Sequence, residues 1–125
     1  MKPRDFLNVL ENPDAPALPA DRDEGAEHLL LLIVHMFFAD GRLDEGEIAL
    51  MQRLVGADED AEKLIVAMAD RTLDLDALAA AYPDPKDRDD IVTVAEHAVW
   101  GDDHPDYSEW DVIDKLVDKL GVVRD

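Results

Sequence analysis

An almost unbroken apolar run covers residues 29–39 and leads into a short acidic segment and then a second amphipathic stretch. A helix that is apolar on every side is typical of the centre of a helical bundle. As a helix the run would be about 16 Å long, too short for a bilayer core of about 30 Å, so it predicts a buried helix. The stretch that follows has its apolar residues at helical spacing, at Ile48, Met51, Leu54 and Val55.

The rest of the chain repeats this helical spacing, and no segment shows the alternation of a strand. The fold class is therefore predicted to be all-α, a single bundle of about six to seven helices. Prolines break the chain between Glu11 and Pro19, so residues 1–22 are expected to form an N-terminal arm with a Pro-rich linker, and residues 23–125 the helical domain. Helices are expected over residues 2–10, from Asp21 or Asp23 to Gly41, from Asp44 to Gly56, and over 58–71, 74–82, 84–100 and 106–120.

Two halves of the chain resemble each other at an offset of 62 residues. Between residues 29 and 55 this offset gives six identities, where residue frequencies alone would give roughly two. The identical pairs are His35 and His97, Asp40 and Asp102, Asp44 and Asp106, Glu47 and Glu109, Leu54 and Leu116, and Val55 and Val117. We interpret the chain as two pseudo-repeated helix-turn-helix halves, each with an acidic turn.

Helix capping accounts for four of the six carboxylates in these turns. Asp44 and Asp106 stand where an N-cap is expected, and Glu47 and Glu109 follow three residues later, as in a capping box. A purely structural role therefore explains these four residues without any ligand.

Capping does not account for Asp40 and Asp102, which are expected at the C-terminal end of the preceding helix. Unpaired carbonyl groups already concentrate negative charge there, so a carboxylate is unfavourable unless it shares a cation. Carboxylates, helix-end carbonyls and water would suit a hard divalent ion such as Ca²⁺, Mg²⁺ or Mn²⁺. The sequence leaves a metal site and a structural turn as open alternatives, with Asp40, Asp44, Glu47, Asp102, Asp106 and Glu109 as the candidate ligands.

Known carboxylate sites do not fit this pattern. An EF-hand loop needs Gly at position 6 and Glu at position 12, but counting from Asp40 these positions hold Glu45 and Met51. The Glu-x-x-His pairs of di-iron bundles are absent from the sequence. His35 and His97 are expected to be hydrogen-bonded core residues and His28 a surface residue, whereas His104 could add a ligand to the second turn.

The formal charge of −19, from 12 basic and 31 acidic side chains, opposes binding to nucleic acid or anionic membranes. It favours cations and basic protein partners. The sequence has no cysteine, no nucleophile elbow, no P-loop and no dinucleotide fingerprint, so we expect a protein that is not an enzyme. The start of the chain lacks the apolar run of a secretory signal, so we expect a soluble cytoplasmic protein without membrane insertion.

The stretch from Phe37 to Glu47, Phe-Phe-Ala-Asp-Gly-Arg-Leu-Asp-Glu-Gly-Glu, resembles the Ala-Asp-Gly signature of the TerB-like tellurite-resistance family. The N-terminal domain of DnaJ-like co-chaperones shares this signature. The closing stretch from Lys119 to Val122 is similar to the last helix of that family, so the likeness runs from about Asp23 to Val122.

This resemblance implies one all-helical domain of two related halves, with acidic turns near one another that hold a divalent metal ion. It also implies a non-enzymatic module of stress response that acts through protein partners, either basic or part of a membrane-associated complex. The second turn departs from the family pattern, because Gly101-Asp102-Asp103 replaces Asp-Gly. The alternative is an acidic protein-interaction scaffold that binds no metal.

Overall fold

The structure is a computed structural model that describes residues 1–125 except 13, 19–21, 39–44, 57–58, 101–106 and 123–125, with the backbone alone at 98–100 and 107–109. The described residues form seven helices and no strand, which confirms the predicted all-α bundle. The helices are α1 (Pro3–Glu11), α2 (Glu24–Phe37), α3 (Glu45–Val55), α4 (Ala61–Ala69), α5 (Leu75–Ala81), α6 (Pro85–Trp100) and α7 (Tyr107–Leu120). In this part of the chain no helix is long and apolar enough to cross a membrane.

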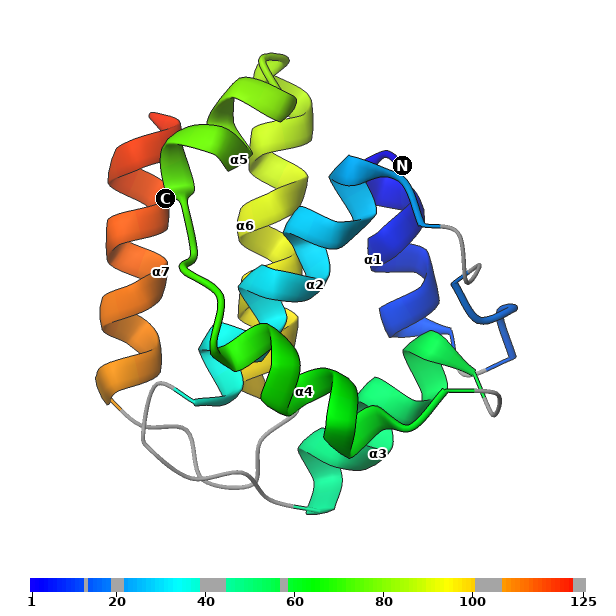
Figure 1. The fold of residues 1–125 in the computed structure, drawn as a ribbon. Helices are drawn as coiled ribbons and strands as arrows, with labels where there is room; N and C mark the ends of the chain where they lie inside the picture. Colours follow the sequence, from blue (N-terminus) through cyan, green and yellow to red (C-terminus); the bar gives the residue numbers. More distant parts are fainter. Residues whose placement is uncertain (13, 19–21, 39–44, 57–58, 101–106, 123–125) are drawn as a thin grey trace.

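Helix α2 lies at the centre of the bundle, as its apolar sequence predicts (Figure 1). It contacts α6 most extensively and also packs against α1, α4, α5 and α7. Every residue from Leu29 to Val34 is buried, because neighbouring helices cover all sides of this helix. On α3, by contrast, the buried apolar residues follow a single face, at Met51, Leu54 and Val55.

Helix α1 is part of the same core, although the sequence suggested an arm over residues 1–22. It packs along α6 and also touches α2 and α3 (Figure 1). Phe6 is fully buried, and Leu7, Val9 and Leu10 are at most 9% exposed. The short helix therefore contributes its apolar face to the bundle, while the proline-containing segment after it connects α1 to α2.

Capping residues set several of the helix boundaries that the sequence predicted. Asp23 caps α2 by accepting a hydrogen bond of 2.8 Å from the backbone N–H of Ala26. Asp60 and Asp74 cap α4 and α5 in the same way. Gly56 stops α3 with a positive φ of 87°, a backbone conformation that glycine adopts without steric cost.

The helix boundaries match the internal repeat in part. Helices α2 and α6 begin at residues 24 and 85, within one residue of the offset of 62, whereas α3 and α7 end at residues 55 and 120, three residues away from it. The packing of the two helix pairs differs. Helix α6 lies along α7, whereas α3 packs mainly against α4 and also on α1 (Figure 1).

Two arginines donate hydrogen bonds from their guanidinium groups to the C-terminal ends of helices. Arg53 on α3 donates to the carbonyl oxygens of Val9 at 2.5 Å and Leu10 at 2.7 Å, at the end of α1. Arg88 on α6 donates to the carbonyl oxygens at the ends of two helices, those of Ala79, Tyr82 and Leu120. A planar fork of five donors suits this task, because one side chain can satisfy several of the carbonyls that a helix end leaves unpaired.

Candidate functional site

The structure describes the side chain of only one of the six predicted metal ligands. Asp40, Asp44, Asp102 and Asp106 lie outside the described residues, and of Glu109 only the backbone is described, within α7. Glu47 is described: it belongs to the first turn of α3 and is only 4% exposed. A carboxylate in the first turn of a helix is stabilised by the helix dipole, which agrees with the position predicted for it.

Helix α2 ends earlier than the sequence predicted, whereas α6 ends at the predicted residue. Helix α2 ends at Phe37, three residues before Asp40, and α6 ends at Trp100, two residues before Asp102. Asp40 and Asp102 themselves lie outside the described residues, so their position at a helix C-terminus remains a prediction.

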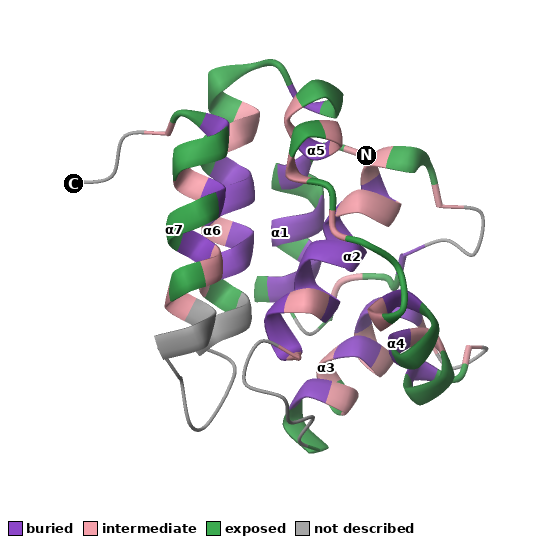
Figure 2. Cartoon of the chain, turned by 60° about the vertical axis from the view of Figure 1, so that its left-hand side comes forward, coloured by how far each residue is buried: buried purple, intermediate pink, exposed green. Residues whose placement is uncertain are grey.

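The described parts of α3 and α7 begin at Glu45 and Tyr107. The predicted caps, Asp44 and Asp106, lie outside the described residues. Helices α2 and α6 run in the same direction, and their C-terminal ends lie at the same end of the bundle as the starts of α3 and α7, the lower end in Figures 1 and 2. The sequence thus connects both acidic segments to helix ends on one side of the molecule.

Within the described ranges, no group of three or more His, Asp or Glu side chains is arranged to hold a metal ion. The two repeat-related histidines have different surroundings. His35 is half-buried and its Nε2 donates to the carbonyl oxygen of Arg71 at 2.7 Å, which confirms the predicted hydrogen bond. His97 is exposed instead of lying in the core, and its Nε2 is 3.0 Å from a carboxylate oxygen of Glu11. His28, predicted at the surface, is half-buried next to Glu24.

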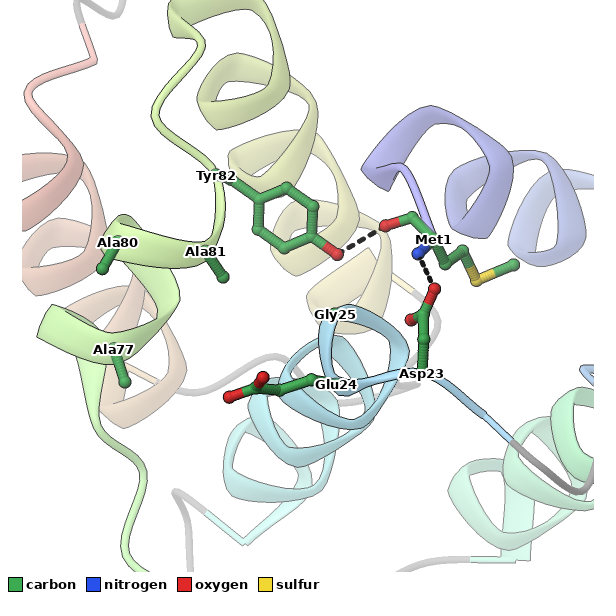
Figure 3. Close-up of a pocket in the computed structure, with 8 residues that line it drawn as sticks. All are labelled: Met1, Asp23, Glu24, Gly25, Ala77, Ala80, Ala81 and Tyr82. Atoms are coloured by element: carbon green, nitrogen blue, oxygen red, sulfur yellow. Dashed lines mark hydrogen bonds and ion pairs between the residues drawn. The ribbon is translucent and has the colours of Figure 1, made fainter.

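A hollow in the described surface lies where α2 begins and α5 ends (Figure 3). It has a volume of about 570 Å³ and is lined by Met1, Asp23, Glu24, Gly25, Ala77, Ala80, Ala81 and Tyr82. The amino group of Met1 pairs with the Asp23 carboxylate, and the Tyr82 hydroxyl donates to the Met1 carbonyl oxygen at 2.5 Å. These contacts connect the start of α1 to both α2 and α5.

The electrostatics of this hollow favour a charged Asp23 and a neutral Tyr82. The hydrogen bond from the Met1 amino group, helped by the N–H of Ala26, lowers the pKa of the Asp23 carboxyl. Burial raises the pKa of Tyr82 to about 12, and the negative charges of Asp23 and Asp87 act in the same direction. The phenol therefore remains a hydrogen-bond donor throughout the neutral range.

Gly25 makes room for the Tyr82 side chain. A β-carbon at this position would lie 2.2 Å from the Tyr82 hydroxyl oxygen and 3.2 Å from the Met1 carbonyl oxygen. The sequence analysis did not identify this cluster, because Met1, Asp23 and Tyr82 are at least 22 positions from one another and none belongs to a recognised motif. The Glu24-Gly25 pair in the first turn of a helix is the one local signal, since glycine is unfavourable inside helices.

The comparisons with known proteins do not assign the chain to a family: no family model, curated protein or solved structure matches it.

Proposed function

We propose that this protein is a non-enzymatic, divalent-metal-binding helical module of the TerB-like kind, which acts in stress response through protein partners. The observation that carries the proposal is the common location of the helix ends that flank the acidic segments. The ends of α2 and α6 and the starts of α3 and α7 lie at one end of the bundle (Figure 1).

Chain length limits how far the candidate ligands can be from these ends. Asp40 is two residues beyond Phe38, and Asp102 two beyond Trp100. An extended chain spans at most about 3.5 Å per residue, so the Cα atom of each aspartate is within about 7 Å of that of Phe38 or Trp100 respectively. Two carboxylate sets tethered to one end of the bundle could serve one shared ion or two neighbouring ions. Oxygen ligands of this kind suit Ca²⁺, Mg²⁺ or Mn²⁺.

Calorimetry with and without each divalent ion tests the proposal. Millimolar Ca²⁺, Mg²⁺ or Mn²⁺ is expected to raise the melting temperature, because an ion that binds only the folded state stabilises it. Asp40→Asn and Asp102→Asn are expected to abolish the rise. Asp114→Asn on the exposed side of α7 is a matched control, since it removes one negative charge away from the acidic segments. A melting temperature that no divalent ion shifts would refute the proposed metal site.

A metal-free acidic scaffold is the second candidate, and the arginine contacts favour it. Arg53 and Arg88 donate to backbone carbonyl oxygens, so these two positive charges are used inside the fold while the formal charge is −19. A basic partner would then bind through long-range attraction that salt screens. Partner capture should be lost at high salt and unaffected by a chelator, whereas the metal module should respond to the chelator.

A further inference from the structure

The outer face of α4 differs from the rest of this strongly acidic surface. Val66 is 58% exposed and is the one large apolar side chain found exposed among the described residues. It lines a shallow hollow of about 350 Å³ together with Glu62, Lys63 and Ala67. Helix α4 lies at the periphery of the fold, with exposed residues on the side away from the other helices (Figure 2).

Helix α4 has a separate side that faces the core, and Val66 does not lie on it. Ala61, Ile65 and Met68 are at most 2% exposed and attach α4 to the core. The opposite side of the helix therefore presents Val66 and Ala67 to solvent, without a described helix over them.

Charges of opposite sign flank this apolar centre. Lys63 precedes Val66 and Asp70 follows Ala67, and both charged residues are exposed. Seven residues of helix are two turns, so Lys63 and Asp70 stand on the same side of α4, about 10 Å apart along its axis. Asp70, the C-cap residue of α4, keeps a helical backbone with φ −75° and ψ −14°, so this register continues to it.

We propose that a second copy of this chain covers this surface, with the two α4 helices packed antiparallel about a two-fold axis next to Val66 and Ala67. The antiparallel arrangement places Lys63 of each copy opposite Asp70 of the other, and it brings the two Val66 side chains together. A parallel arrangement would instead oppose like charges. The small side chain of Ala67 lets the helices approach closely, and the two-fold axis makes the patch complementary to itself.

The same charges explain why this face, rather than another, would pair two highly negative molecules. Glu62, Lys63 and Asp70 together carry a formal charge of only −1, so the patch adds little to the general repulsion between chains of charge −19. One nine-residue helix offers a small contact area, and interfaces of that size are weak. The dimer is therefore expected at high micromolar to millimolar concentration, and moderate salt should favour it by screening the general repulsion.

Sedimentation equilibrium over that concentration range, in moderate salt, tests the proposal. The unaltered chain should associate to a dimer, and Val66→Asp should remain a monomer. Lys63→Glu and Asp70→Lys should each abolish the dimer, because each opposes like charges at both symmetric contacts. The double variant Lys63→Glu/Asp70→Lys should restore it. Ala49→Asp, at an exposed alanine of α3, adds the same charge as Val66→Asp on another helix and should leave the dimer intact.

Circular dichroism on each variant confirms that the fold is retained. A monomer at every concentration would overturn the proposal, as would a dimer that persists in Val66→Asp. Failure of the double charge exchange to restore a dimer that both single variants lose would overturn the antiparallel arrangement.

Discussion

The hydroxyl of Tyr82 donates a hydrogen bond to the carbonyl oxygen of Met1, 81 residues earlier in the chain. Helix α1 starts at Pro3, so this bond fixes the beginning of α1 on the last turn of α5. Gly25 permits the contact, because any larger residue would meet the Tyr82 ring. The first prediction tests this close approach.

Gly25→Ala is expected to destabilise the protein by about 1–3 kcal/mol, the usual cost of overpacking, despite the better helix propensity of alanine. Tyr82→Phe removes the nearest atom, so it should recover part of the loss when both changes are combined. Gly46→Ala is the matched control, since Gly46 is also the second residue of its helix but is exposed. Urea unfolding of the four variants measures the effect, and equal losses for Gly25→Ala and Gly46→Ala would contradict the contact.

The Tyr82 phenol should ionise only at strongly alkaline pH. In a Tyr107→Phe background Tyr82 is the remaining tyrosine of the two, and ultraviolet absorbance should give a midpoint at a pKa of about 12. The folded-state value lies above the ordinary value of 10.0, so the stabilisation is complete below that value and is lost as pH rises towards 12. An ordinary midpoint in the folded protein would show that the hydroxyl is not held in this buried site.

Asp23 should contribute stability that acid removes. Its pKa is lowered in the folded state by the Met1 amino group and the Ala26 N–H, so its contribution is present above the ordinary value of 3.8 and is lost as pH falls below it. Asp23→Ala should cost about 0.5–2 kcal/mol near neutral pH, as the loss of an N-cap does, and less at low pH. Urea unfolding of Asp23→Ala and of the unaltered chain at neutral and at acidic pH measures this difference.

Arg88→Lys should destabilise the fold although it keeps the charge. Lysine cannot donate at once to the carbonyl oxygens of Ala79, Tyr82 and Leu120, and a lost hydrogen bond from a charged group costs about 1.5–3 kcal/mol. Arg4→Lys is the control, because Arg4 is 68% exposed and its ion pair with Asp90 is long, at 3.6 Å. Thermal unfolding should give a clearly lower melting temperature for Arg88→Lys than for Arg4→Lys. Matching melting temperatures would argue against stabilisation of the helix ends by Arg88.

Helix α1 should be required for the stability of the whole domain. Phe6→Ala is expected to cost about 3–5 kcal/mol, as other truncations of a buried phenylalanine do, because its side chain is fully buried. Asn8→Ala, at an exposed position of the same helix, should change stability by less than about 0.5 kcal/mol. If chemical denaturation finds the two variants equally stable, α1 is a dispensable arm after all.

Helix positions followed from the sequence because their signals are local. Asp74 and Pro85 marked helix starts, and Gly56 and Gly121 marked helix ends through residues only one turn away. The packing position of α1 could not be predicted from the sequence, because the prolines after Glu11 indicate a break in the chain but not where the preceding helix packs. Burial of Phe6 depends on α6, about 80 residues later, which no local pattern reports.

In the candidate site, too, features with a local signal were predicted and long-range contacts were not. The spacing of Asp44 and Glu47 predicted a helix start here, and Glu47 lies in the first turn of α3. Ion binding by Asp40 and Asp102 remains a prediction, because it depends on how two segments 62 residues apart meet. The pairing of Met1 with Asp23 and Tyr82 was not predicted for the same reason: it needs three helices to be in place first.

The inward orientation of Arg53 and Arg88 has a consequence for how this molecule tolerates its environment. Their guanidinium groups bind carbonyl oxygens, and folding compresses the net charge of −19 that remains after counting them into a small volume. Added electrolyte should therefore strengthen the native state rather than weaken it, and dilute buffer should be the condition under which this protein is most easily unfolded.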